Sequence, residues 1–334
     1  MIQVKAPLRV SFCGGGSDMY TFYSKYGGCV LNTTIDKYIY LNLIDNFDKK
    51  ETILSYSPLI ETVRDFDQIQ HDRFRQCLKT FNVFGVNISS LSDVPFGTGL
   101  GSSSAFTVAL IKLLSIYNNE YMSKEAIAEL ACKIEIDDLR VYSGKQDQYA
   151  SSFGGLNFIE FNKDGTVCVN PINLEKSKRH KLENNLCMFY VGGVHNSSDI
   201  VRKQIENVRH SKKKQDSLIE MCNITKSLKK SLDNGDISAV GDALKENWEI
   251  KKSLSDGITN DRIDYVYDMA VNAGAYSGKL LGAGNAGFML FYVPNEKRES
   301  VIYTLDDIGV KEMPFNFEFD RFNCGVRERI VVGE

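Results

Sequence analysis

Apolar side chains recur along the chain with both strand and helix periods. Residues 35–44 alternate well enough for a half-buried strand, and 83–89 and 186–191 read as further strands. After residue 105 the apolar positions fall at helical spacing: Phe106, Ala109, Leu110, Leu113, Leu114 and Tyr117. This spacing predicts an amphipathic helix. A second helix is expected from the N-cap residue Ser123 to about Leu139.

The second half of the chain predicts helices at 198–234, 236–254 and 260–274, and strands at 288–293 and 326–332. The mixed order of strands and helices indicates an α+β fold. A chain of 334 residues favours two domains. A polar stretch at 162–185 marks the boundary, so we expect domains at 1–180 and 181–334.

Composition narrows the class of protein. Hydrophobic residues make up 43% and charged residues 25%, with a formal net charge of −3, which gives no reason to expect nucleic acid or an anionic membrane as a partner. No apolar run approaches the ~18 residues of a membrane span. The N-terminus lacks the pattern of a secretory signal. The eight cysteines form no C-x-x-C pair, so we expect reduced thiols and a cytoplasmic protein.

A glycine- and serine-rich loop carries the strongest chemical signal. Residues 95–105 read PFGTGLGSSSA and lead into the predicted helix. Glycines let the backbone approach a ligand closely, and a helix N-terminus favours phosphate. The P-loop pattern fails here because no lysine follows the glycines. An ordinary glycine-rich helix entry with a serine cap is the alternative.

A second glycine motif, GAGNAG at 282–287, matches the dinucleotide pattern G-x-G-x-x-G. In a dinucleotide-binding fold a helix should follow the motif, but here the apolar run 288–293 predicts a strand. The motif is therefore weak evidence for a dinucleotide site.

Two carboxylates are candidates for chemistry. Asp147 lies in GKQDQ before a stretch of small residues, and in a cleft it could accept or orient the proton of an attacking hydroxyl. A turn aspartate with only local backbone bonds is the alternative. Glu135 lies at the edge of the apolar stripe of its helix and Asp138 lies within it, which is costly unless each is paired or bound to a metal.

These segments resemble the galactokinase–homoserine kinase–mevalonate kinase–phosphomevalonate kinase (GHMP kinase) family. The resemblance covers residues 5–18, 97–105, 135–155 and 252–290. It implies an ATP-dependent phosphotransferase with an N-terminal ribosomal-protein-S5-domain-2-like domain and a C-terminal ferredoxin-like α+β domain. It also implies that ATP and Mg²⁺ are the cofactors. The oligomeric state stays open, with a homodimer possible.

The resemblance also assigns roles. Asp147 and Arg9 fall on the catalytic base and on the basic residue near the transferred phosphate, and Ser103 and Glu135 fall on the magnesium ligands. The nucleotide loop comprises Gly97, Thr98, Gly99, Leu100, Gly101, Ser102, Ser103 and Ser104. The acceptor-binding positions comprise Gly15, Gly16, Ser17, Asp18, Lys145, Gln146, Lys279 and Gly284. Three glycines at 14–16 replace the Gly-Glu-His of galactokinases, which makes galactose doubtful.

Within the family, GGGSD, GLGSSSAF and GKQDQYAS look most like the kinases of D-glycero-D-manno-heptose 7-phosphate. We therefore expect transfer to the anomeric hydroxyl, giving the 1,7-bisphosphate for nucleotide-activated heptose synthesis. Such a substrate needs a second anion site, for which His195, Ser197 and Ser198 at a predicted helix start are candidates. The alternatives are a kinase for a neutral sugar such as fucose or galactose, and a catalytically inactive sugar sensor.

Overall fold

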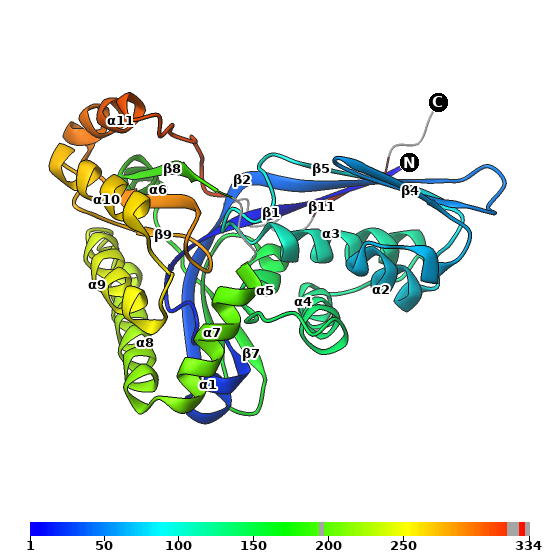
Figure 1. Cartoon of the computed structure of the whole chain (residues 1–334), viewed down its shortest axis with the longest axis horizontal. Coiled ribbons are helices and arrows are strands. Elements are labelled where there is room, and N and C mark those ends of the chain that lie inside the picture. The colour runs from blue at the N-terminus through cyan, green and yellow to red at the C-terminus, as the bar shows by residue number, and fades with distance from the viewer. Residues whose placement is uncertain (194–196, 319–326, 331–334) are drawn as a thin grey trace.

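Two sheets of unequal size form the framework of the molecule (Figure 1). The computed structural model describes residues 1–193, 197–318 and 327–330, without the side chains of residues 197, 198 and 327–330. In the larger sheet the strands β11, β1, β2, β5, β3 and β4 lie in this order, and β6 pairs with β2 and β7. Its elements are β1 (Ile2–Cys13), α1 (Tyr20–Tyr26), β2 (Gly28–Asp45), β3 (Thr52–Tyr56), β4 (Leu59–Val63), α2 (Asp72–Phe81), β5 (Val86–Ser92), α3 (Ser102–Tyr117), α4 (Lys124–Cys132), α5 (Gln146–Phe153), β6 (Leu156–Phe161), β7 (Val167–Pro171), α6 (Lys176–Asn184) and β11 (Arg327–Ile330).

The smaller sheet is antiparallel in the order β8-β10-β9 and packs against helices at the left of Figure 1. Its elements are β8 (Leu186–Gly192), α7 (Ser197–His210), α8 (Lys212–Asp233), α9 (Ala239–Leu254), α10 (Asp261–Ala273), β9 (Ser277–Leu280), β10 (Gly287–Tyr292) and α11 (Arg298–Asp307). An isolated bridge joins Phe189 of β8 to Glu312. The order strand, helices, two strands, helix and bridging segment is the one expected of a ferredoxin-like unit.

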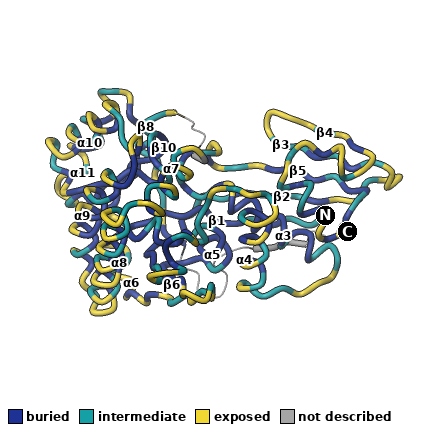
Figure 2. The backbone as a smooth tube through the Cα atoms, turned by 60° about the horizontal axis from the view of Figure 1, so that its bottom comes forward, coloured by how far each residue is buried: buried dark blue, intermediate teal, exposed yellow. Residues whose placement is uncertain are grey.

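The strand β1 lies at the centre of the molecule and is buried from Ala6 to Cys13 without a break (Figure 2). Successive side chains of a strand point to opposite faces, so uninterrupted burial means that both faces are covered. The helices α3, α5, α8 and α9 all contact β1. The register with β2 shifts between Pro7 and Arg9. Such a bulge suits a proline, which lacks the N–H of a regular ladder, and it redirects the side chains that follow.

Most predicted elements are confirmed. The strand expected at 35–44 lies within β2, the helix after the glycine loop is α3, and Ser123 caps α4 by accepting from the Ala126 N–H. The helix from Ser123 continues to residue 138 with a π-helical turn over Lys133–Asp138. The strands β3, β4, β6, β7 and β9 and the helices α1, α2, α5, α6 and α11 were not predicted from the sequence pattern.

The change from one sheet to the other occurs between β7 and β8, and the expected boundary at residues 180 and 181 falls inside α6. The chain end does not stay with the second sheet, because β11 pairs with β1 in antiparallel register, Ile2 opposite Ile330. In the part of the chain that the structure describes, no helix is long and apolar enough to cross a membrane. The seven described cysteines are free thiols, and six of them are buried.

Candidate active site

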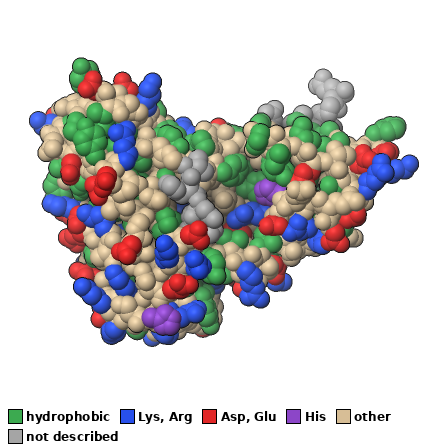
Figure 3. All heavy atoms as spheres, in the orientation of Figure 1, with side chains coloured by type: hydrophobic (Ala, Val, Ile, Leu, Met, Phe, Trp, Pro, Cys, Tyr) green, Lys and Arg blue, Asp and Glu red, His purple; other side chains and the backbone are tan. Residues whose placement is uncertain are grey.

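A cavity of about 410 Å³ brings together segments that are far apart in the sequence. Its walls come from residues 9–19, 73, 97–104, 135–147, 201–204, 247–251 and 279–286. Among its described lining residues four are cationic (Arg9, Arg73, Lys251 and Lys279) and three are acidic (Asp18, Glu135 and Asp147). On the face shown in Figure 3, by contrast, basic and acidic side chains are interspersed. The cavity is therefore more cationic than a chain of net charge −3 would suggest.

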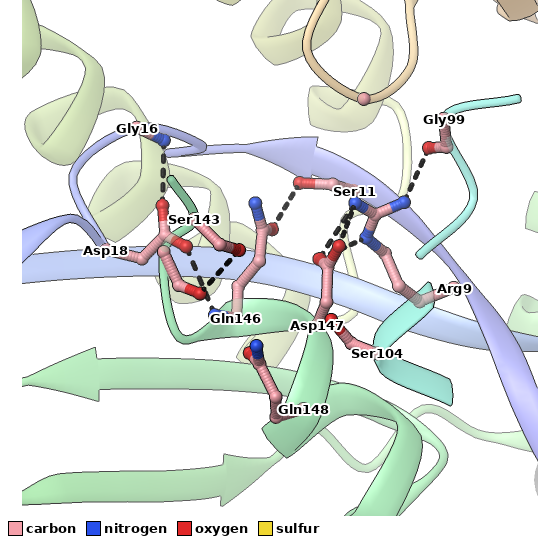
Figure 4. A network of polar contacts seen from close by, with 12 residues as sticks. Arg9, Ser11, Gly16, Asp18, Gly99, Ser104, Ser143, Gln146, Asp147 and Gln148 are labelled. Carbon is pink, nitrogen blue, oxygen red and sulfur yellow. Dashed lines mark hydrogen bonds and ion pairs between the residues drawn. The ribbon is translucent and has the colours of Figure 1, made fainter. Parts of the chain in front are cut away.

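Arg9 and Asp147 form a two-point ion pair in this cavity (Figure 4). The Arg9 Nε donates to Oδ1 of Asp147 and Nη2 donates to Oδ2, both at 2.8 Å. The remaining guanidinium nitrogen, Nη1, donates to the Gly99 carbonyl at 2.6 Å. A planar guanidinium fixes a carboxylate in orientation as well as position. Arg9 thus holds Asp147 of the first turn of α5 against the glycine loop.

Asp147 retains capacity to accept further hydrogen bonds. A carboxylate offers about four lone-pair positions. In Asp147 each oxygen accepts one hydrogen bond from Arg9, so about half of that capacity is open. The side chain is 20% exposed, and it lies on the cavity wall. A hydroxyl group in the cavity could therefore donate to Asp147 without breaking the pair with Arg9.

Glu135 differs from Asp147 because it has no capacity left to accept further hydrogen bonds. It lies in the π-helical turn after α4 and is 1% exposed. Oε1 accepts from the Arg73 Nε at 2.9 Å and from the Thr107 hydroxyl at 2.6 Å. Oε2 accepts from the Ser104 hydroxyl at 2.8 Å and from the Gln148 Nε2 at 2.6 Å. All of its acceptor positions are used by the protein.

The proposed magnesium ligands lie on the same cavity wall but differ in availability. Ser103 is exposed in the first turn of α3, and a hydroxyl and a carboxylate are ligand types that Mg²⁺ accepts. Glu135 fits an ion only by giving up one of its four hydrogen bonds. Asp138, the next candidate in the sequence, is exposed and accepts from the Gln76 Nε2, and it does not line the cavity. The described residues contain no cluster of three or more metal-ligating side chains.

The N-terminus of α3, which follows the predicted nucleotide loop, lies at the cavity. Among the described residues no side chain caps α3, whose N-cap Gly101 is left-handed at φ 76°. Gly97, Gly99, Gly101, Ser102 and Ser103 line the cavity, so backbone N–H groups and hydroxyls can face an anion there. Ser104 also lines it, but its hydroxyl donates to Glu135. The side chains of Thr98 and Leu100 are wholly buried, so only the backbone of these two loop residues could contact a nucleotide.

The second glycine motif, 282–287, packs against the nucleotide loop, 97–104. The Phe288 N–H donates to the Thr98 carbonyl at 3.2 Å. A Cβ on Gly287 would overlap that carbonyl, and its φ of 105° is one that other residues rarely adopt. Gly282 and Gly99 meet backbone to backbone in the same way. These glycines are thus required by loop packing, and the strand β10 that follows excludes a dinucleotide fold here.

Asp18 organises the wall that is expected to hold the acceptor. Its Oδ1 accepts from the Gly16 N–H at 2.9 Å and its Oδ2 from the Gln146 N–H at 3.1 Å (Figure 4). Burial raises the pKa of Asp18, and nearby Asp147 raises it further, while the two backbone donors oppose this shift. A Cβ on Gly144 would collide with the Asp18 carboxylate. Gly15, Gly16, Asp18 and Gln146 all line the cavity.

Two expected acceptor residues do not face the cavity. Ser17 is fully buried, and its hydroxyl exchanges hydrogen bonds with the backbone of Cys29, donating to O and accepting from N. The Lys145 ammonium donates to the Gly165 carbonyl at 3.0 Å and lies 5.3 Å from the Tyr23 ring centroid. Both side chains are absent from the cavity lining. The position of a residue in a motif does not determine the direction of its side chain, so a role of Ser17 and Lys145 in acceptor binding stays a prediction.

Of the other residues expected to bind the acceptor, some line the cavity and some are not described by the structure. Lys279 and Gly284 line the cavity. His195 lies outside the described residues, and Ser197 and Ser198 lie in the first turn of α7 with side chains that are not described. The structure adds Arg73, Asn247 and Lys251, which the sequence argument did not select. Asn247 and Lys251 lie in the apolar stripe of α9. A polar side chain within an apolar stripe was the signal in the sequence that could have found them.

Two models of a known family match the chain. "GHMP kinases N terminal domain" matches residues 70–155, and "GHMP kinases C terminal" matches residues 228–304. The first covers the nucleotide loop and Asp147, and the second covers α9 and the second glycine motif.

Individual relatives match almost the whole chain. A D-glycero-alpha-D-manno-heptose 7-phosphate kinase of Campylobacter jejuni is 33% identical over 91% of this chain and 93% of its own. A galactokinase of Pyrococcus furiosus is 24% identical over 90% and 91%. The crystal structure of a D-glycero-D-manno-heptose 1-phosphate kinase from Bacteriodes thetaiotaomicron superposes with a TM-score of 0.81 at 26% identity, covering both chains completely.

Proposed function

The chain belongs to the GHMP kinase family and is a sugar kinase, a phosphotransferase with an alcohol group as acceptor, and on that premise we propose that it phosphorylates a heptose phosphate. The proposed reaction is ATP plus D-glycero-D-manno-heptose 7-phosphate giving the 1,7-bisphosphate and ADP. Its product would serve nucleotide-activated heptose synthesis. A cytoplasmic location is part of the same proposal.

The observation that carries the proposed mechanism is the state of Asp147. This carboxylate is fixed by Arg9, keeps open acceptor positions, and borders both the α3 N-terminus and the wall around Asp18. A phosphoryl group held at the helix N-terminus and a hydroxyl held near Asp18 would meet beside it. Positioning and charge stabilisation supply most of the catalysis in phosphoryl transfer.

In the proposed step the acceptor hydroxyl oxygen forms a bond to the γ-phosphorus, and the bond between that phosphorus and the bridging oxygen of ADP breaks. Asp147 accepts or orients the hydroxyl proton. Arg9 offsets negative charge on the transferring group while it keeps its contact with the Gly99 carbonyl. The α3 N-terminus holds the β- and γ-phosphates.

Magnesium is part of the proposal as the partner of ATP. Ser103 and Glu135 are the residues that would hold it, Glu135 by giving up one of its four hydrogen bonds. When bound, the ion neutralises phosphate charge. Arg73 pairs with Glu135 in the structure and would keep that side chain oriented.

Three observations support a heptose phosphate as acceptor. The relative from Campylobacter jejuni is named for heptose 7-phosphate, and the structure from Bacteriodes thetaiotaomicron for heptose 1-phosphate. In addition, the cavity carries an excess of cationic side chains. A neutral sugar is the second candidate, favoured by the galactokinase relative. The two heptose kinases differ in the phosphate they are named for, so the position of transfer is a separate question.

Release of ADP with a panel of acceptors tests this proposal. The panel contains D-glycero-D-manno-heptose 7-phosphate, the free heptose, fucose and galactose, each with saturating ATP and Mg²⁺. We expect kcat/KM for the 7-phosphate to exceed that for the free heptose by about 10²-fold or more, the worth of a few charge-assisted hydrogen bonds. Preference for fucose or galactose would establish the neutral-sugar kinase instead. Absence of ADP release with every acceptor would favour the inactive sensor.

A further inference from the structure

Two buried lysines of the cavity lack an acidic partner. Lys279 is 2% exposed and its ammonium donates to the carbonyls of Ser11 and Phe12 at 2.9 and 3.1 Å. Lys251 is 7% exposed and donates to the Gly282 carbonyl. Within the described residues neither lysine forms a salt bridge, whereas Arg9 and Arg73 each pair with a carboxylate. A buried charge without an opposite charge is costly, which indicates that an anionic ligand completes the site.

A second polar group without a partner lies next to Lys251. Asn247 is wholly buried, precedes Lys251 by four residues on α9 and therefore lies one turn away on the same face. Its Oδ1 accepts from the Gly14 N–H at 3.1 Å, while its Nδ2 has no hydrogen-bond partner among the described residues. Both side chains line the cavity. A buried amide N–H₂ beside an ammonium group suits phosphate oxygens.

The contacts of Asn247 connect this pair to the acceptor wall. Asn247 is bonded to the glycine loop 14–16, whose Gly16 is bonded to Asp18. Lys251, however, donates to the Gly282 carbonyl, and Gly282 meets Gly99 of the nucleotide loop backbone to backbone, so the pair lies between the acceptor wall and that loop. An anion held by the α9 pair would therefore adjoin the acceptor on the Asn247 side, and the phosphates of ATP are the other ligand that the test distinguishes.

We propose that Lys251 and Asn247 of α9 bind the phosphate that the acceptor already carries. This inference rests on the proposed function and assigns its phosphate specificity to a site other than the start of α7. Burial, with Lys279 and Arg9 nearby, holds the pKa of Lys251 well below its usual range. A bound phosphate supplies the missing opposite charge and favours the ammonium form.

The test compares two acceptors in full-length variants. The measured quantity is the ratio of kcat/KM for heptose 7-phosphate to kcat/KM for free heptose. Lys251→Met should lower this ratio by about 10²-fold, because the charge-assisted contacts with phosphate are lost. Lys252→Met is the matched control, since Lys252 is the next residue on α9, pairs with Glu249 and lies outside the cavity lining. Its ratio should equal that of the wild type.

Asn247→Asp keeps the test valid if Lys251→Met does not fold. The aspartate can still accept from the Gly14 N–H, and it gives Lys251 an internal counter-ion while it repels phosphate. Its ratio should also fall by at least about 10-fold. A high wild-type ratio that both variants retain would overturn this assignment and leave the proposed function standing. A wild-type ratio near one would overturn both.

A further outcome distinguishes binding of the acceptor's phosphate from binding of the phosphates of ATP. If Lys251→Met lowers kcat/KM equally for both acceptors and raises KM for ATP, the pair binds the nucleotide and the assignment to the acceptor is wrong. If KM for ATP stays within about two-fold while the ratio falls, the acceptor phosphate is the ligand.

Discussion

At the scale of single residues, the two carboxylates nearest the nucleotide loop differ in the hydrogen bonds they already accept. Asp147 keeps open positions beside its pair with Arg9, and Glu135 has none. Asp147 can therefore accept a hydrogen bond from a substrate hydroxyl, whereas Glu135 can do so only if it loses one of its hydrogen bonds with the protein. Each carboxylate therefore gives its own prediction.

Asp147→Asn should lower kcat by about 10²-fold or more while the affinity for ATP stays close to that of the wild type. The amide keeps the shape of the side chain, but it is a far weaker proton acceptor and its N–H₂ opposes the Arg9 donors. Single-turnover kinetics and equilibrium binding of ATP would measure the two quantities. Asp138→Asn is the matched control, because Asp138 is exposed and outside the cavity lining. Near-normal turnover of folded Asp147→Asn would refute the assignment.

Glu135→Gln should have two effects. Stability should fall by on the order of 3 kcal/mol, because an amide oxygen and an N–H₂ cannot accept from Arg73, Thr107, Ser104 and Gln148 together. The Mg²⁺ concentration that gives half-maximal turnover should rise if Glu135 is a ligand of the ATP-bound ion. Denaturant unfolding and a Mg²⁺ titration measure these effects. A lower stability with an unchanged Mg²⁺ midpoint would leave Glu135 a purely structural role.

Residues that belong to a motif could be predicted from the sequence to line the cavity, whereas residues that packing brings to the cavity could not. Asp147, Arg9 and Asp18 lie in recognisable motifs, and all three line the cavity. Ser17 lies in the same motif, yet its side chain turns toward Cys29, which a linear pattern cannot show. Lys251 and Arg73 belong to no motif. They reach the cavity because α9 and α2 pack beside it.

At the scale of elements, a regular local pattern could again be predicted from the sequence, whereas elements without such a pattern were missed. Strands and helices with a regular apolar period were predicted, as in β2 and α3. The hairpin of β3 and β4 was missed because Leu59 and Ile60 are exposed, so apolar positions there do not mark a buried face. Within the described part of the chain the edge strand β7 pairs only with β6, and it is only partly buried, which left a weak pattern of apolar positions.

The contact between the two glycine loops predicts the effect of Gly287→Ala. The added methyl group would displace the Thr98 carbonyl and with it the nucleotide loop, so KM for ATP should rise by about 10-fold or more. Gly165→Ala is the control, because Gly165 also has a positive φ, 93°, but no atom lies near its Cβ direction. Steady-state kinetics at varied ATP would measure both. Equal KM values in the two variants would show that loop packing does not position the nucleotide.

At the scale of the whole molecule, the cavity depends on long-range pairing. The N-terminal strand supplies Arg9, α5 supplies Asp147 and α9 supplies Lys251, so the site is complete only after both sheets have formed. Element types and the α+β class could be predicted from local patterns. The return of β11 to β1 could not, because strand partners this far apart leave no local signal.

The identity of the product tests the central claim most directly. Full-length enzyme, ATP, Mg²⁺ and D-glycero-D-manno-heptose 7-phosphate would be incubated, and the sugar product examined by phosphorus-31 NMR with coupling to protons. The account predicts one equivalent of ADP and a sugar with two phosphate signals, the new one coupled to the anomeric proton. A new phosphate on any other carbon, or no doubly phosphorylated sugar while a neutral sugar is phosphorylated, would contradict it.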